Sequence, residues 1–217
     1  MTEPGIRLQP TGWSNSVRSV MGRPARYTTD QILDAARDLV LEGGARAATV
    51  DGIVAAIGAP KGSIYHRFDT FEDLLGEMWL RAVRRSQERY LSALEADDPI
   101  EAAVAAALSL YDFAREEPGD ARLIASLRRE DVVGTVTDDR LRDALLTVNS
   151  GLGVTIRALA RRLYGRATRP CIERVMFATV DLPVGAVRRH LITGSALPRT
   201  LRPQLEAAVR AALEPVD

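Results

Sequence analysis

The most informative stretch of this sequence is Gly58-Ala59-Pro60-Lys61-Gly62-Ser63-Ile64-Tyr65-His66-Arg67-Phe68. Its opening glycine and proline predict a tight turn into a short helix, because proline suits a first helical position, where no amide donor is needed. Ile64 and Phe68 are four residues apart and therefore share the buried face of that helix. The polar face carries five side chains that can donate hydrogen bonds to phosphates or base edges: Lys61, Ser63, Tyr65, His66 and Arg67. The pattern indicates a nucleic-acid-binding surface.

Two helices are predicted immediately before this stretch. The first begins at a capping box, Thr28-Thr29-Asp30-Gln31, and ends at Gly43-Gly44. Thr49 is the predicted N-cap of the second, and Asp51 lies in its first turn, where the helix dipole favours an anion in a capping role. Two helices, a glycine-containing turn and a short third helix match a helix-turn-helix unit.

The rest of the sequence has helical periodicity, and no segment shows the convincing period-two alternation of a strand, so the predicted fold class is all-α. Apolar residues at three- and four-residue spacing predict helices over about 70–96, 99–117, 121–129, 138–163, 172–187 and 201–213. Pro183 is expected to kink the fifth of these or to divide it in two, because proline has no amide hydrogen to donate.

Three regions follow from these patterns. Residues 1–26 are expected to form a flexible tail, because glycine and proline interrupt every helical period there. The arginines of this tail are either solvated or form a basic arm along DNA, and Met21 is an alternative start of translation. Residues 27–73 form the predicted three-helix DNA-binding domain, and residues 74–217 form a second helical domain.

The composition restricts the class of protein. The 217 residues include 29 basic and 29 acidic side chains, so the net charge is zero. This argues against a wholly basic nucleic-acid-binding protein, but not against one small basic patch on a neutral body. Cys171 is the only cysteine, so no intramolecular disulfide can form, and no apolar run approaches the ~20 residues of a membrane-spanning helix. We expect a cytoplasmic protein with no membrane association.

No catalytic or metal-binding constellation is recognised. His66 lies within the predicted DNA-binding motif, Cys171 lacks a histidine and an acid at motif spacing, and no glycine-rich phosphate loop follows a strand. Two histidines and one cysteine do not supply the close ligand pairs of a zinc site. We therefore expect no enzyme activity, no cofactor and no metal. The alternative is an all-helical enzyme or adaptor that retains the N-terminal fold without regulating DNA.

Residues 27–75 resemble the tetracycline-repressor-type (TetR) family of bacterial transcription regulators. The resemblance rests on the motif from Gly58 to Phe68, followed by Glu72-Asp73-Leu74-Leu75. It implies that the helix after the turn enters the major groove and that its neighbours hold the DNA backbone. Phe71 departs from the family, which often has a phosphate-binding lysine at this position. The DNA-binding residues that the resemblance implies are Thr49, Lys61, Gly62, Ser63, Tyr65, His66 and Arg67.

The same resemblance implies a function for the whole chain. We expect a homodimeric transcription regulator that represses from a pseudo-palindromic double-stranded DNA operator and is released by a small organic effector. The inward faces of the middle helices are mostly apolar, so the effector is expected to be hydrophobic or amphipathic. A regulator without a ligand is the alternative.

Two further sets of residues are predicted for the second domain. The pocket wall is expected to include Met78, Trp79, Tyr111, Phe113 and Leu152. Side chains of these types at helical spacing also suit an ordinary core. In the TetR family the last two helices of each subunit usually form a four-helix dimer interface. The residues expected in this interface are Val175, Thr179, Leu205 and Val209.

Overall fold

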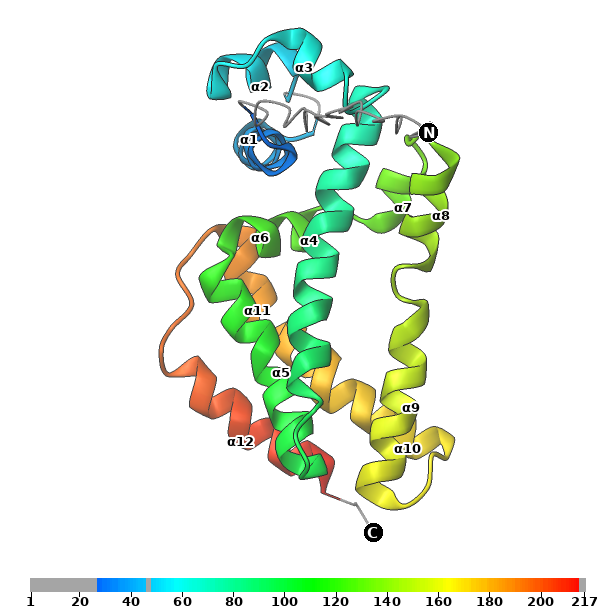
Figure 1. Cartoon of the computed structure of the whole chain (residues 1–217). Helices are drawn as coiled ribbons and strands as arrows, with labels where there is room; N and C mark the ends of the chain where they lie inside the picture. The colour runs from blue at the N-terminus through cyan, green and yellow to red at the C-terminus, as the bar shows by residue number, and fades with distance from the viewer. Residues whose placement is uncertain (1–26, 46–47, 215–217) are drawn as a thin grey trace, which may run out of the picture.

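The computed structural model describes residues 27–45 and 48–214, and within these ranges every regular element is a helix (Figure 1). The predicted all-α class is therefore confirmed. The predicted tail, residues 1–26, lies outside the described residues. None of the described helices is both long and apolar enough to cross a membrane.

Three helices form the N-terminal unit: α1 (Thr29–Gly43), α2 (Val50–Ile57) and α3 (Lys61–Tyr65). The predicted capping box is present, because Thr28 Oγ1 accepts a hydrogen bond from the Gln31 amide at 3.1 Å and the Gln31 side chain accepts one from the Thr28 amide at 2.9 Å. Thr49 caps α2 by accepting a hydrogen bond from the Gly52 amide at 3.0 Å. The centre of this unit is made by three buried side chains, Ile32, Ile53 and Ile64.

Helix α4 (Phe71–Ala93) runs from the N-terminal unit along the length of the second domain (Figure 1). Thr70 is its N-cap and accepts a hydrogen bond from the Asp73 amide at 3.1 Å. Gly76 is needed where α4 passes the segment 136–141, because a Cβ there would lie 2.7 Å from Val136 Cγ2 and 3.0 Å from Leu141 Cδ2. Any larger residue would push the two segments apart.

Five helices follow α4: α5 (Pro99–Glu116), α6 (Pro118–Ser126), α7 (Arg129–Val133), α8 (Asp139–Thr147) and α9 (Ser150–Tyr164). The sequence predicted one continuous helix over 138–163, and this prediction is wrong. The chain breaks at Val148 and Asn149. Gln87 of α4 donates to the Val148 carbonyl at 3.1 Å and to the Asn149 side-chain oxygen at 2.7 Å, so a contact between distant segments occupies the groups at the break.

The C-terminal part consists of α10 (Arg169–Met176), the π-helical turn η1 (Phe177–Asp181), α11 (Leu182–Thr193) and α12 (Leu201–Leu213). The sequence predicted that Pro183 kinks or divides this region; the helical conformation continues from Arg169 to Thr193, and the π turn η1 interrupts the α-helix just before Pro183. Proline cannot donate a hydrogen bond to the carbonyl four residues earlier, and the wider π turn directly before it absorbs this defect.

Two hydrophobic clusters fill the molecule. The first cluster joins α1–α3 and the first half of α4 to side chains from α6–α8, namely Leu123, Val132, Leu141 and Leu145. The second cluster packs the end of α4 with α5 and α9–α12. The predicted boundary between residues 73 and 74 falls in the first turn of α4, and the core of the N-terminal unit extends well beyond it.

Candidate nucleic-acid interface

The turn between α2 and α3 depends on Gly58. Its φ of 67° lies in the left-handed region that favours glycine. The Tyr27 hydroxyl donates to the Gly58 carbonyl at 2.6 Å and so ties this turn to the start of α1. Pro60 is the N-cap of α3, with an extended ψ of 138°. The helix therefore begins at Lys61, one residue later than the sequence predicted. These contacts hold α3 at a fixed angle to α2.

Helix α3 presents a short polar face at the end of the molecule. The Lys61 side chain and Tyr65 are about half exposed, and Gly62 and His66 are exposed. A Cβ at Gly62 would meet no atom within 4 Å, so the space beside the helix backbone is open. The Ser63 hydroxyl donates to the Pro60 carbonyl at 2.6 Å. Ile64 and Phe68 point into the core, as the spacing predicted.

Lys61 forms an ion pair with Asp51 at this face. Its Nζ lies 2.8 Å from Asp51 Oδ1, and both side chains are largely exposed, at 51% and 75%. The hydrogen bond to Asp51 and the charge of that carboxylate raise the pKa of Lys61 above its usual value. As predicted, Thr49 makes the cap hydrogen bond and Asp51 lies in the first turn of α2. Asp51 therefore offsets the charge of the only lysine in the chain.

Arg67 has contacts that tie α3 to α1. Its Nη1 donates to the Ser63 carbonyl at 2.7 Å and its Nη2 to the Tyr27 carbonyl at 2.9 Å. Two carbonyl groups therefore hold the guanidinium in place, and its other N–H donors make no hydrogen bond within the part of the chain that the structure describes. Thr49, the last of the predicted residues, is exposed at the start of α2.

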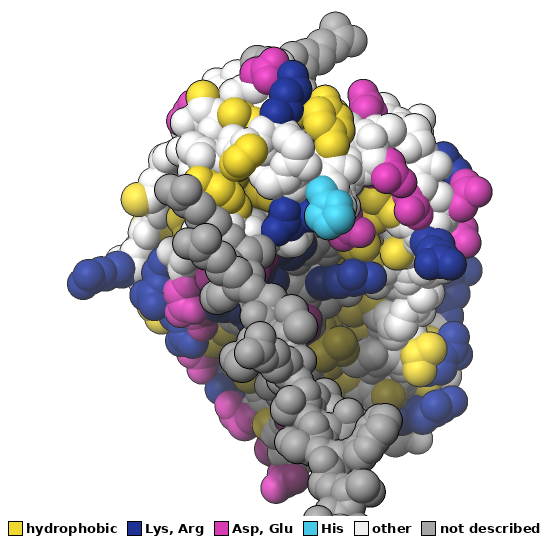
Figure 2. All heavy atoms as spheres, turned by 45° about the horizontal axis from the view of Figure 1, so that its top comes forward, with side chains coloured by type: hydrophobic (Ala, Val, Ile, Leu, Met, Phe, Trp, Pro, Cys, Tyr) yellow, Lys and Arg dark blue, Asp and Glu magenta, His cyan; other side chains and the backbone are white. Residues whose placement is uncertain are grey.

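The end of the molecule formed by α1–α3 is not uniformly basic. Figure 2 looks onto this end and shows basic and acidic side chains interspersed with polar and apolar surface. This agrees with the zero net charge of the sequence. Binding to DNA here would depend on a few well-placed donors, because a continuous positive surface is absent from the part that the structure describes.

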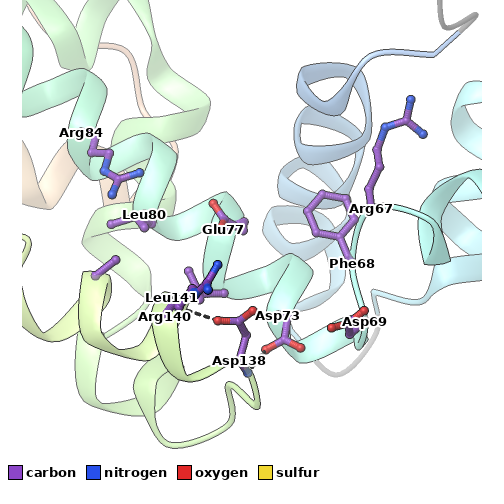
Figure 3. A pocket seen from close by; sticks show the side chains of 11 residues that line it. Arg67, Phe68, Asp69, Asp73, Glu77, Leu80, Arg84, Asp138, Arg140 and Leu141 are labelled. Atoms are coloured by element: carbon purple, nitrogen blue, oxygen red, sulfur yellow. Dashed lines mark hydrogen bonds between the residues drawn. The ribbon is translucent and has the colours of Figure 1, made fainter.

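A polar cleft of about 320 Å³ lies behind α3, between the first half of α4 and the start of α8 (Figure 3). Asp73 forms part of the wall of this cleft. Its Oδ1 accepts hydrogen bonds from the amides of Thr137 and Asp138, at 2.8 and 3.0 Å, and its Oδ2 accepts from the hydroxyls of Thr137 and Thr70, at 2.6 and 2.5 Å. Burial alone would raise the pKa of Asp73, but these hydrogen bonds outweigh it and lower the pKa to about 2.

The second domain contains an apolar groove with two lobes. The larger lobe has a volume of about 290 Å³ and includes Trp79 and Leu152 in its wall; the smaller, of about 120 Å³, includes Phe113. Met78 and Tyr111 line neither lobe. Met78 is fully buried in the first cluster, and Tyr111 lies in the second with its hydroxyl on the Pro198 carbonyl at 3.1 Å.

The residues predicted for the dimer interface need correction. All four belong to the core of a single chain and are at most 2% exposed, so no surface contact can involve their side chains. The helical periodicity correctly identified a buried stripe, but the same stripe suits a core or an interface. The residues concerned are Val175, Thr179, Leu205 and Val209.

Residues 32–78 match the sequence profile of a family described as bacterial regulatory proteins, tetR family. The N-terminal domain of this chain is a TetR-family domain. No curated protein matches the chain in sequence.

Solved structures share the fold over most of the chain. They include the TetR family transcriptional regulator PfmR from Thermus thermophilus, with a TM-score of 0.65 and 19% identity over 84% of this chain and 96% of that one. The fatty acid degradation regulator FadR from Bacillus halodurans has a TM-score of 0.65 and 18% identity over 88% and 100%. The ketosteroid transcriptional regulator KstR2 of Mycobacterium tuberculosis has 0.64 and 16% over 87% and 94%. The TetR-type fold therefore extends through both domains.

Sequence reasoning missed two residues that position the TetR-type helix-turn-helix. Tyr27 contacts Gly58 across 31 positions, and Asp73 contacts Thr137 across 64. Neither contact produces a periodic or local signal in the sequence. The only hint was an acidic residue in the first turn of α4, which the helix dipole explains equally well.

Proposed function

We propose that this TetR-type chain is a transcription repressor that binds a pseudo-palindromic DNA operator as a homodimer and is released by a small hydrophobic or amphipathic ligand. The observation that supports DNA binding is the exposed donor face of α3 within a TetR-family domain. Two copies of α3, one from each protomer, would enter successive major grooves, ~34–36 Å apart or multiples of that distance.

The polar face of α3 suggests a division of roles. Lys61 and Ser63 lie at the start of the helix and would face bases or phosphates, with Gly62 permitting close approach. Tyr65 and His66 would contact the backbone. The remaining donors of Arg67 and the start of α2 at Thr49 would meet adjacent phosphates.

For the dimer we propose the outer face of η1 and α11. Phe177 and Ile192 are exposed apolar side chains on these elements, about half accessible to solvent. Small residues on the adjacent α12, Ala207, Ala208 and Ala211, are also exposed and would allow close approach of a second helix pair. This surface lies on the helices that the sequence predicted for the interface, but on exposed residues in place of the buried stripe; Val184 and Arg188, between Phe177 and Ile192, line the apolar groove and lie outside the proposed contact.

Helix α6 would couple the effector to DNA. Its residues Ala121, Ile124 and Ala125 line the apolar groove. Its buried Asp120 lies 2.8 Å from Arg37 Nη1 of α1 and 3.1 Å from Arg85 Nη1 of α4. A ligand that displaces α6 would therefore move α1 and, through it, α3. Ligand-dependent couplings of this kind are typically worth ~1–3 kcal/mol.

The effector is expected to be hydrophobic or amphipathic, because most side chains in the groove wall are apolar. The same fold in regulators named for fatty acid degradation and for ketosteroids supports a hydrophobic ligand here. A ligand present at 100 times its dissociation constant would stabilise the fold by ~2.7 kcal/mol, which a thermal-shift screen detects.

Selection of genomic DNA fragments with purified protein tests the proposal and identifies the operator. On that operator, Lys61→Ala and Tyr65→Phe are expected to weaken binding while helicity and oligomeric state stay unchanged. If Lys61 neutralises a phosphate, the slope of log affinity against log salt falls by about one unit in Lys61→Ala. Wild-type affinity in both variants would contradict the assignment of α3 to the DNA.

A further inference from the structure

The two lobes of the apolar groove lie side by side, because four residues line both. Ser86 of α4, Leu110 of α5, Ile124 of α6 and Val184 of α11 line both lobes. The larger lobe extends toward Trp79 and α9, and the smaller one extends between α5, α6 and α11. The apolar body of a ligand can lie against these walls.

Most polar side chains in the wall of the larger lobe already form hydrogen bonds within the protein. Gln87 donates to Asn149 at 2.7 Å, and the Tyr90 hydroxyl shares a hydrogen bond with the Thr179 hydroxyl at 2.8 Å. The Ser86 hydroxyl forms no hydrogen bond within the part of the chain that the structure describes. Ser86 is thus the polar side chain in the shared wall that is open to a ligand.

Only one charged side chain lines either lobe, and it is a cation. Arg188 of α11 lies in the wall of the smaller lobe, and no carboxylate lines the groove. Within residues 27–45 and 48–214, Arg188 forms neither an ion pair nor a hydrogen bond. Its neighbour Arg189 donates to the His190 ring at 3.1 Å and lies outside the groove wall.

We infer that the effector of this groove is an amphipathic organic anion, whose carboxylate pairs with Arg188 and whose hydrocarbon body lies against the apolar walls of the groove. The inference rests on the proposed effector site and adds the chemical class of its ligand. A carboxylate beside apolar walls needs a charged partner, and the planar guanidinium can bind it with two parallel hydrogen bonds. The Ser86 hydroxyl, in the wall that both lobes share, suits a second polar atom of the ligand. A cationic ligand would meet Arg188 unfavourably, and a ligand with several charges would find one partner only.

Isothermal calorimetry on the full chain with matched pairs of ligands tests this inference. One pair is decanoate and decanol, and the other is naphthoate and naphthalene carboxamide. Each acid is expected to bind about tenfold more tightly than its neutral partner, as one charge-assisted contact provides. In Arg188→Gln the acid should lose this advantage while the affinity of the neutral ligand stays unchanged. Arg189→Gln is the matched control, because it removes the same charge one residue away and should retain the preference.

The outcomes separate the inference from the proposed function. Equal affinity for acid and neutral ligand in the wild-type protein, or a preference for the acid that survives in Arg188→Gln, overturns the assignment of Arg188 and leaves the apolar effector site intact. If no member of either pair binds the folded protein, both the inference and the effector site fail. Operator binding measured on the same preparation shows independently whether the DNA-binding part of the proposal holds.

Discussion

At the scale of single residues, the pairing of Lys61 with Asp51 sets the charge of the DNA-binding face. The sequence identified Lys61 as the chain's only lysine, but the position of Asp51 opposite it depends on how α3 packs against α2. A phosphate that binds Lys61 competes with Asp51 for the ammonium, and the carboxylate remains near the negative DNA backbone. Asp51 should therefore weaken binding to all sequences alike.

We expect Asp51→Asn to bind the operator about three- to tenfold more tightly at low salt, because it frees Lys61 and removes a repulsive charge. Fluorescence anisotropy across a salt series measures the effect, which should shrink as salt rises. Glu95→Gln is the control, because it makes the same change in net charge at an exposed position beyond the far end of α4. Equal gains in both variants would show a general charge effect instead.

Asp73 gives the stability of the protein a pH dependence in the acid range. Its pKa of about 2 in the folded chain lies below the value of 3.8 for a free aspartate. A lowered folded pKa means that the stabilisation is complete above pH ~4 and is lost as the pH falls toward 2. The shift corresponds to about 2 kcal/mol in the free energy of unfolding.

We expect urea unfolding to show this loss between pH 5 and 2 in the wild-type protein, and a shallower dependence in Asp73→Asn. The variant should also be less stable at pH 7 by about 1–3 kcal/mol, since it leaves the amides of Thr137 and Asp138 with a poorer acceptor. An unchanged pH dependence in Asp73→Asn would assign the acid sensitivity to other carboxylates.

At the scale of elements, α6 holds α1 and α4 together through one buried carboxylate. Asp120 is 1% exposed and contacts Arg37 and Arg85. Gly119 beside it leaves room for the Arg37 side chain, because a Cβ there would lie 2.6 Å from Arg37 Nε and the guanidinium would have to shift. The fit between these helices is therefore specific in both shape and charge.

Removing the charge of Asp120 takes the one buried carboxylate from both Arg37 and Arg85, which keep only the more exposed carboxylates of Asp30, Asp34 and Asp38. We expect Asp120→Asn to reduce the free energy of unfolding by about 3 kcal/mol, as for other broken buried pairs. Chemical denaturation measures this loss. Glu116→Gln breaks the exposed pair between Arg89 and Glu116 and should change stability by less than about 1 kcal/mol. Similar losses in the two variants would mean that burial of Asp120 adds nothing.

The elements themselves were largely predictable. The capping threonines at 28, 49 and 70 and the interruption of the α-helix just before Pro183 follow from local chemistry, which the sequence displays directly. The break between α8 and α9 was missed because it depends on Gln87 from α4. The α3 donors were identified in advance for the same local reason, but their partners Asp51 and Tyr27 come from other elements.

At the scale of the whole molecule, the helical periodicity of the sequence identified which side chains are buried, but not whether they pack against the same chain or against a second protomer. Leu205 and Val209 pack inside one chain, so charged substitutions there would unfold the protomer and would not test the interface. The exposed side chains Phe177 and Ile192 allow the test without damage to the core.

We expect Phe177→Glu combined with Ile192→Glu to give a folded monomer with poor operator affinity, because a charge cannot be buried in an apolar contact without a partner. Light scattering at low micromolar concentration and thermal unfolding measure the two properties. Val154→Glu is the control, because it places the same charge at a residue 71% exposed on α9 and should remain dimeric. A dimeric double variant would move the interface to another face.

The extent of the N-terminal core has a consequence for synthesis of the chain. Val132, Leu141 and Leu145 belong to the same cluster as Ile32 and Ile53. When a ribosome has released only the first half of α4, α1–α3 cover only part of the apolar side of that helix, and the nascent DNA-binding unit cannot complete its interior until α8 emerges. The nascent chain therefore exposes apolar surface throughout this interval, which makes it a target for chaperones. A fragment ending near residue 97 should aggregate, whereas one that continues through α8 should acquire the native packing of α1–α3.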